Sequence, residues 1–331
     1  MTTEQNANII NKIMVCHSHV DRAMHLMERC YRGALEGGDA RGLAVIGESG
    51  SGKSKILKYS KKIHSPHRDA DGRKVPVLLA SVPSKPTVMN LVEELLYEIG
   101  DNLYHKGTEA QKTKRLRKFL RSAETRILAL DEFQHFVDQS SHKIQHEVAD
   151  WLKILVEKTG VSLVVAGLPR LSYVIKSNEQ LERRFQAPAI MPRFNWAVHD
   201  DQVEFRSILD AMQEGLSSYS FPCLSEYEMA FRVYCATGGL IGRVANLFKE
   251  VIANSYDTGR TEISLEDLAV AALQASYDLP SEIKEPFSRS FKVLPSEELI
   301  TEVMKIGAEQ DLPPEKPKRR RKPKTMSHVT S

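Results

Sequence analysis

Hydrophobic positions along the chain follow two different periods. Between residues 42 and 191, short runs of consecutive apolar residues alternate with longer stretches in which apolar residues recur every three or four positions. The short runs predict strands buried on both faces, and the longer stretches predict amphipathic helices. The predicted strands cover residues 42–46, 75–80, 127–130, 161–166 and 189–191. The predicted helices between them cover residues 53–62, 87–101, 108–122, 142–158 and 170–184. Alternation of this kind predicts an α/β fold, a parallel sheet flanked by helices.

The strand pattern is confined to the middle of the chain. The first 40 residues have a helical period that ends at Gly37-Gly38-Asp39, and after residue 197 only helical periodicity remains. Residues 313–324 are rich in proline and cations and have no apolar residue to offset the entropy of ordering, so we expect this last segment to be disordered. We therefore expect five segments, namely an N-terminal helical segment (1–40), an α/β domain (41–197), a small all-helical domain (198–277), a C-terminal extension (278–311) and a basic tail (312–331).

Composition places the chain among ordinary globular proteins, with 41% apolar and 27% charged residues. The four cysteines show no C-x-x-C spacing, so neither a disulfide framework nor a zinc ribbon is expected. No apolar run approaches the roughly 18 residues of a membrane span, and the polar N-terminus lacks the features of a signal peptide. We expect a cytoplasmic protein.

The net charge of +3 conceals an uneven distribution. The tail, residues 312–331, holds seven basic residues and one acid, and residues 105–121 hold seven basic residues against the single acid Glu109. Positive charge is thus concentrated in two short segments, which is typical of surfaces that bind polyanions.

The strongest chemical signal follows the first predicted strand. Residues 47–54 read Gly-Glu-Ser-Gly-Ser-Gly-Lys-Ser, a complete G-x-x-x-x-G-K-S pattern that opens a predicted helix. Its glycines let successive backbone N–H groups point at phosphates, and the helix N-terminus adds partial positive charge. Lys53 can reach the β- and γ-phosphates, and the Ser54 hydroxyl can ligate Mg²⁺. The expected nucleotide contacts are Gly47, Glu48, Ser49, Gly50, Ser51, Gly52, Lys53, Ser54 and Lys55.

Two carboxylates end the third predicted strand. Asp131 is placed to hold Mg²⁺ through water, and Glu132 is placed to orient and deprotonate the attacking water. The following residues 133–136 are expected to begin a helix, although Gln134 or His135 could reach the γ-phosphate side. Together with Lys53, the acid pair predicts hydrolysis of a nucleoside triphosphate.

Arginines occur at two further positions. Arg183 and Arg184 end the predicted helix before the last strand, and Arg243 opens a helix in the second domain after Gly-Gly-Leu-Ile-Gly. Phosphoryl transfer spreads charge over the γ-phosphate oxygens, so a guanidinium supplied by a neighbouring subunit can couple assembly to hydrolysis. Each of these residues could instead be a surface arginine or form a structural salt bridge.

With these motifs in place, the sequence resembles the AAA+ ATPases, and more narrowly the TnsC/TniB branch of DNA-transposition regulators, which includes those of CRISPR-associated transposons. The resemblance covers about residues 10 to 275 and rests on GESGSGKS, LALDEFQHF, VVAGLPR, QLERRF and TGGLIGRVANLFKEVI. It implies an AAA+ P-loop NTPase domain followed by a helical lid, with Lys53 and Glu132 catalytic. It also implies that Arg184 is the finger supplied in trans, with Arg183 its alternate, and that Arg243 is the lid sensor contacting ATP. Ala166-Gly167 depart from the family, because many AAA+ proteins place a polar sensor there, and this departure implies slow hydrolysis.

The resemblance also implies oligomers that wind around duplex DNA. Our candidate surface is formed by residues 105–121, which we call the basic helix. Leu116, Phe119 and Leu120 share one face of it, and the cations are expected on the opposite, solvated face. The candidate DNA contacts are Lys106, Lys112, Lys114, Arg115, Arg117, Lys118 and Arg121. Alternatively, these cations contact only solvent and do not bind DNA. Nothing resembles a helix-turn-helix, so binding is expected to be independent of sequence. The tail could bind DNA, dock on a transposase, or have neither role.

The function implied is that of an ATP- and Mg²⁺-dependent regulator of DNA transposition in a bacterium. It would form a hexameric or heptameric ring, or a helical filament, on double-stranded DNA. There it would link a target selector of TniQ or TnsD type to a transposase of TnsA/TnsB type, and hydrolysis would reset the assembly. Three alternatives stay open, namely a helicase- or clamp-loading ATPase, a signalling ATPase that does not act on DNA, and a DNA-coating scaffold that barely turns over ATP.

Overall fold

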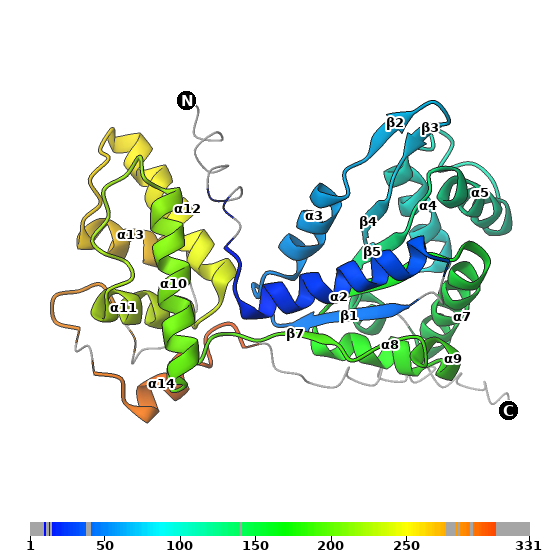
Figure 1. Cartoon of the computed structure of the whole chain (residues 1–331). Coiled ribbons are helices and arrows are strands. Elements are labelled where there is room, and N and C mark those ends of the chain that lie inside the picture. The colour runs from blue at the N-terminus through cyan, green and yellow to red at the C-terminus, as the bar shows by residue number, and fades with distance from the viewer. Residues whose placement is uncertain are drawn as a thin grey trace, which may run out of the picture.

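The elements of the protein form two groups, a sheet with helices on both faces and a cluster of helices beside it (Figure 1). This computed structural model describes residues 10, 13, 15–37, 41–139, 141–275, 283, 285–291 and 294–308. The basic tail, and with it the predicted disorder of residues 312–331, lies outside the described residues. Among the helices that are described, none has both the length and the apolarity needed to cross a membrane.

The sheet has five parallel strands in the order β4-β5-β6-β1-β7. They are β1 (Gly42–Gly47), β4 (Val77–Ser81), β5 (Ile127–Asp131), β6 (Ser162–Gly167) and β7 (Ala189–Met191). All five predicted strands are confirmed. They could be predicted because strands covered on both faces are apolar at nearly every position, as β6, buried along its whole length, illustrates.

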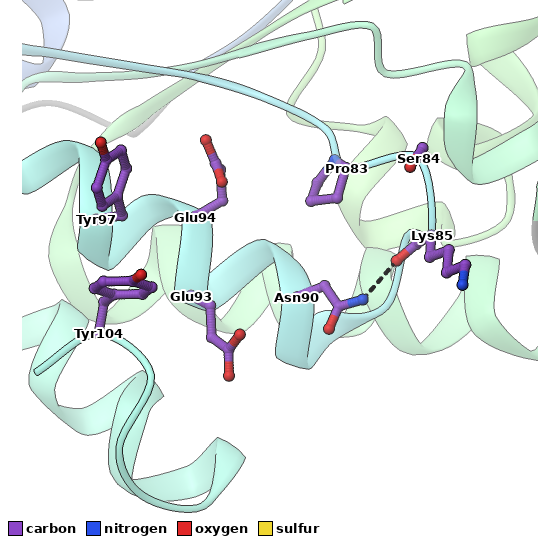
Figure 2. Close-up of a pocket in the computed structure, with 8 residues that line it drawn as sticks. All are labelled: Pro83, Ser84, Lys85, Asn90, Glu93, Glu94, Tyr97 and Tyr104. Carbon is purple, nitrogen blue, oxygen red and sulfur yellow. Dashed lines mark hydrogen bonds between the residues drawn. The ribbon is translucent and has the colours of Figure 1, made fainter.

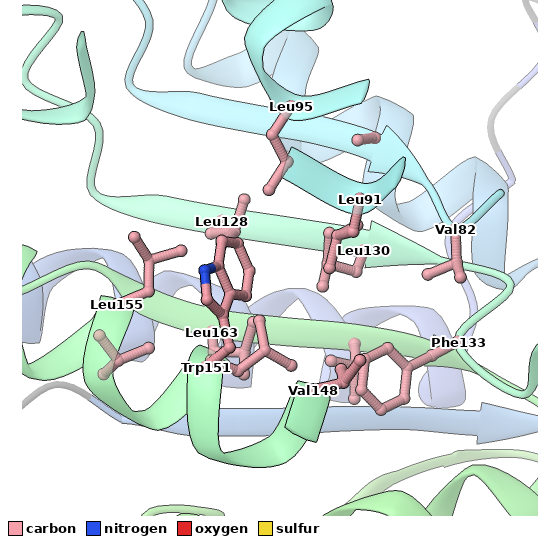
Figure 3. Packing of buried hydrophobic residues seen from close by; sticks show 14 of the residues in the cluster. Val82, Leu91, Leu95, Leu128, Leu130, Phe133, Val148, Trp151, Leu155 and Leu163 are labelled. Carbon is pink, nitrogen blue, oxygen red and sulfur yellow. The ribbon is translucent and has the colours of Figure 1, made fainter. Parts of the chain in front are cut away.

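Each face of the sheet has its own core, because successive side chains of a strand point to opposite sides. Helices α2 (Ser18–Leu35) and α3 (Lys53–Ile63) cover one face, where Leu43 and Val45 of β1 are buried. The other face is covered by α4 (Val88–Ile99), α5 (Glu109–Ser122) and α7 (His142–Thr159). Figure 3 shows this second core, in which α4 and α7 pack on Leu128 and Leu130 of β5.

One local expectation is wrong, and one pair of strands was not expected. The predicted helix over residues 170–184 is divided into η1 (Pro169–Leu171), α8 (Ser172–Lys176) and α9 (Glu179–Glu182). The break occurs because the Asn178 side chain accepts a hydrogen bond from the Leu181 N–H at 2.9 Å and starts a new helix. A hairpin of β2 (His67–Asp69) and β3 (Gly72–Lys74) was not expected, since its exposed, charged strands carry no apolar pattern.

In the described part of the chain after β7, the regular elements are helices, as predicted, and one isolated bridge joins Ser220 and Glu262. The helices are α10 (His199–Gly215), α11 (Tyr227–Thr237), α12 (Ile241–Thr258), α13 (Leu265–Ala275) and α14 (Glu297–Val303). Their core is separate from the two sheet cores and is built around Trp196, Phe231 and Tyr234. The exact domain boundaries at residues 41, 198 and 278 stay a prediction.

Candidate nucleotide-binding site

The glycine-rich loop joins β1 to α3 at the carboxyl edge of the sheet. Gly50 and Gly52 have φ angles of 80° and 96°, a left-handed conformation that other residues rarely adopt, and Gly52 is the N-cap of α3. Within the described residues, the N–H groups of Gly52 and Ser54 have no backbone acceptor. The loop therefore presents N–H donors and the positive end of a helix, the two features that bind phosphate.

Lys53 is held inside this loop. Its side chain is buried, with only 7% of the residue exposed, and the ammonium donates hydrogen bonds to the carbonyl oxygens of Gly47 at 2.8 Å and Glu48 at 2.7 Å. A buried ammonium needs such partners because desolvation of the charge is costly. The positive charge of Lys53 thus lies at the loop, where the motif requires it.

A cleft of about 480 Å³ lies between the loop and α12. One part of its lining is cationic, with Lys53, Lys55, Lys58 and Lys249 beside the Ser54 hydroxyl; another part is apolar, with Ile10, Met212 and Ile241. Burial, together with the charge of Lys249, lowers the pKa of Lys55. An anion in the cleft would relieve this repulsion, so the lining suits a molecule with a polyphosphate group and an apolar ring.

The helical region reaches the loop through the first turn of α12. The Gly242 N–H donates a hydrogen bond to the Gly50 carbonyl oxygen at 2.7 Å. A Cβ at residue 242 would lie only 2.7–3.1 Å from the oxygen and carbon atoms of Gly50, so a side chain would push the helix away from the loop. Closure of the cleft thus depends on a glycine at the start of α12.

A buried arginine that the sequence analysis missed ties three parts of the chain together. The Arg193 guanidinium forms an ion pair with the Glu48 carboxylate of the loop, with Nε 2.8 Å from Oε1. It also donates to the carbonyl oxygens of Gly238, after α11, at 3.2 Å and of Ile306, after α14, at 3.0 Å. No motif contains Arg193, and its only signal is an arginine two residues after the last predicted strand.

The acid pair lies at the same edge of the sheet. Glu132 follows β5 with a left-handed φ of 55°, its N–H donates to Asp131 Oδ1 at 3.0 Å, and its side chain lines the cleft. The Gln134 amide donates to Glu132 Oε2 at 2.5 Å. Hydroxyl and carboxylate oxygens are the ligands that Mg²⁺ prefers, so Ser54 and Asp131 fit the ion chemically.

The predicted site residues divide into two sets. Within the described residues, the predicted nucleotide contacts that line the cleft are Ser49, Gly50, Gly52, Lys53, Ser54 and Lys55. Glu48 is instead engaged by Arg193, and the Arg243 guanidinium lies against Gly307, after α14. The position predicted for the lid sensor at Arg243 therefore stays a prediction.

The other two arginines lie at the opposite edge of the sheet. The Arg184 carbonyl oxygen accepts a hydrogen bond from the N–H of Gly42, the first residue of β1, at 2.8 Å. Its guanidinium is 3.0 Å from Glu157 Oε1, and the neighbouring Arg183 pairs with Glu179 at 2.6 Å. Since the glycine-rich loop follows the last residue of β1, neither arginine lies at the cleft of its own chain.

The basic helix is only partly available to a ligand. Lys112 is 2% exposed and forms an ion pair with Glu93 of α4, so the expectation that it lies on the solvated face is wrong. It lies four residues before Leu116 and therefore on the same, buried face of α5. Arg115 is also engaged, with its Nε 2.5 Å from Asp101 Oδ2. The exposed candidates are Lys106, Lys114, Lys118 and Arg121.

A second cleft, of about 430 Å³, lies over α4 beside the loop that follows β4 (Figure 2). The rings of Tyr97 and Tyr104 meet edge to face in it, with centroids 5.3 Å apart, and Glu93 and Glu94 project from α4. Burial and the nearby Glu98 raise the pKa of Glu94. Carboxylates and phenols outnumber the single Lys85, so this cleft does not suit a polyphosphate.

These features define the class of protein. A five-stranded parallel sheet, a phosphate-binding loop after β1 and a helical region packed on that loop make up the AAA+ P-loop NTPase fold. The family described as bacterial TniB protein matches residues 7–195, more than half of the chain. The chain belongs to the TniB family, and the resemblance found in the sequence is confirmed.

Solved structures show the same fold at low sequence identity. The ORC2 protein of Aeropyrum pernix, in ADPNP and ADP complexes, is 14% identical with a TM-score of 0.59, over 83% of this chain and 73% of that chain. Cdc6p from Pyrobaculum aerophilum is 14% identical with a TM-score of 0.61, over the same shares. Aeropyrum pernix ORC1 in complex with DNA is 14% identical with a TM-score of 0.55, over 82% and 70%. No curated protein matches the chain.

Proposed function

We propose that this protein is an ATPase that assembles on double-stranded DNA and regulates DNA transposition. The observation that carries the proposal is the cleft, where Lys53 and Ser54 of the glycine-rich loop meet Glu132 of the acid pair. A family assignment alone would leave open whether this chain keeps the groups for phosphoryl transfer. The similar ORC2 structure, which contains ADPNP and ADP, supports an adenine nucleotide as the ligand.

The residues divide the chemistry between them. Lys53 and the loop N–H groups bind the phosphates, and Glu132 orients and deprotonates water at the cleft. Mg²⁺, held by Ser54 and Asp131, would neutralise charge on the phosphate oxygens. We expect slow turnover, because Ala166 and Gly167 offer no polar side chain to the γ-phosphate.

The site is incomplete within one copy of the chain. Among the described residues that line the cleft, the cations are lysines and none is an arginine. Arg184 lies at the opposite edge of the sheet, where its side chain is 29% exposed and its guanidinium pairs with the partly exposed Glu157. In our proposal a neighbouring copy brings its Arg184 to the cleft, so that assembly completes the site and nucleotide controls the subunit contacts.

DNA is the proposed surface for this assembly. The exposed cations Lys106, Lys114, Lys118 and Arg121 suit phosphate contacts that require charge but no base reading. The complex of the similar ORC1 protein with DNA supports the same kind of partner. As a TniB protein, the chain would link a target selector to the transposase, and hydrolysis would disassemble the complex.

Electron microscopy of negatively stained protein with duplex DNA tests the proposal. With a non-hydrolysable ATP analogue we expect rings or filaments on DNA, and with ADP we expect isolated particles. Glu132→Gln should assemble with ATP itself and persist, because it binds nucleotide without hydrolysing it. A protein that stays monomeric and does not bind DNA in both nucleotide states would contradict the proposal and favour a signalling ATPase.

A further inference from the structure

The last two residues of β6, Ala166 and Gly167, lack the polar side chain that the γ-phosphate side of such a site commonly has. Gly167 ends β6, and a Cβ added to it would overlap the side-chain oxygen of Gln134. Gln134 is buried, and its amide oxygen occupies the space that a side chain at residue 167 would need. The side chain of Gln134, from the segment after β5, thus lies where a polar side chain at residue 167 would lie.

Both ends of the Gln134 amide are used. Its oxygen accepts a hydrogen bond from the Leu168 N–H at 3.2 Å, and its nitrogen donates to Glu132 Oε2 at 2.5 Å. A backbone N–H requires an acceptor and a carboxylate requires a donor, so the two partners together fix the orientation of the amide. A carboxylate or a hydrocarbon at residue 134 could not satisfy both.

The backbone around Glu132 is anchored to the same strand. The N–H of Phe133 donates to the Ala166 carbonyl oxygen at 2.9 Å, and Glu132 itself has a left-handed φ of 55°. Such a conformation persists in a non-glycine residue only when its surroundings hold it. Gln134 extends this anchoring from the backbone to the carboxylate of Glu132.

We infer that Gln134 is the positioning residue of Glu132, and that it holds the carboxylate toward the cleft from the end of β6. Glu132 lines the cleft and Gln134 does not, so Gln134 acts through Glu132. The inference rests on the proposed ATPase function. Gln134 and Gly167 form a pair, because the glutamine fits only where residue 167 has no side chain.

Steady-state ATP hydrolysis, combined with binding of a fluorescent ATP analogue, tests this role. For Gln134→Ala we expect kcat to fall about 10- to 100-fold, the range for a misplaced catalytic group, with KM and analogue affinity within about twofold of wild type. Gln134→Glu keeps the length and the acceptor for Leu168 but loses the donor, so kcat should fall at least as far. Gly167→Ala should lower kcat by a similar factor, because the added methyl group displaces Gln134. In a Gln134→Ala background, Gly167→Ala should lower kcat little further.

The outcomes separate the inference from the proposed function. An unchanged or raised kcat in Gln134→Ala overturns the inference, as does a loss of nucleotide affinity that matches the loss of kcat. If Gln134→Ala does not unfold cooperatively, Gln134→Glu and Gly167→Ala decide by the same criteria. A wild-type protein that binds ATP and releases no phosphate overturns the proposed ATPase and the inference together.

Discussion

The two edges of the sheet differ in how firmly their charged residues are held. At the carboxyl edge, Lys53 and Arg193 are buried, and their cationic groups bond to the glycine-rich loop. At the opposite edge, Arg183 and Arg184 form ion pairs whose partners are 76% and 39% exposed. The carboxyl edge, which we call the nucleotide edge, is preorganised by buried contacts within one chain. The opposite edge, which we call the arginine edge, holds its two arginines in partly exposed ion pairs.

This difference indicates how the work of the site is divided. Lys53 is held at the loop by contacts within its own chain, so its charge is already in place for phosphate, which favours binding by a single copy. A surface arginine contributes little to its own fold and can exchange one carboxylate for another partner. Nucleotide binding should therefore be a property of the monomer, and hydrolysis a property of the assembly.

The largest expected effect is on binding at the nucleotide edge. Lys53→Ala should weaken ATP binding about 100-fold, since it removes charge-assisted hydrogen bonds worth about 3 kcal/mol. Titration of a fluorescent ATP analogue measures the change. Lys62→Ala, an exposed lysine near the other end of α3, is the matched control and should bind normally. Equal affinities for the two variants would contradict the assignment of the loop.

The second prediction concerns the contributions of Arg193 and Arg184 to the stability of the fold. Arg193→Ala should lower the free energy of unfolding by about 3 kcal/mol, because it removes a buried guanidinium that pairs with Glu48 and donates to two carbonyl oxygens. Arg184→Ala should lower it by less than about 1 kcal/mol, as expected for a partly exposed ion pair. Urea unfolding followed by circular dichroism measures both. A similar loss in the two variants would remove the distinction between the edges.

The smallest expected effect concerns DNA. Replacing Lys106, Lys114 and Lys118 together by Gln should reduce the slope of log affinity against log salt by roughly 0.9 for each lost phosphate contact. Filter binding over a salt series gives the slope. A control variant carries Gln at Lys62, Lys143 and Lys176, which are exposed elsewhere. If the slope of log affinity against log salt falls by the same amount in both variants, the basic helix is not the DNA-binding surface.

The sequence was sufficient for the sheet and the loop, because both are encoded locally. Strands buried on both faces produce apolar runs, and the phosphate loop has fixed residues at fixed spacing. The exposure predicted for Lys112 is wrong because charge alone does not fix the face of a helix, whereas the spacing of four residues from Leu116 does. The bonds of Arg193 join residues 45 to 145 positions apart, and no local pattern contains such information.

The sequence contains two features that bear on the role of Gln134, but their relation cannot be inferred from the sequence alone. The sequence has Ala166-Gly167 where a polar sensor is usual, and Gln134 follows the acid pair closely enough to reach the γ-phosphate side. Only the pairing of strands shows that the glutamine occupies the space that the glycine leaves open. The glycine at residue 167 and the glutamine at residue 134 are therefore parts of one structural arrangement.

The central claim is that each catalytic site combines the nucleotide edge of one copy with the arginine edge of another, and mixing two inactive variants tests it. Glu132→Gln keeps Arg184, and Arg184→Ala keeps the complete acid pair. We predict that each alone shows almost no DNA-stimulated ATP hydrolysis and that an equimolar mixture recovers a substantial part of the wild-type rate. Arg183→Ala serves as the control and should retain activity alone. A mixture as inactive as its components, or an Arg184→Ala protein as active as wild type, would contradict the claim.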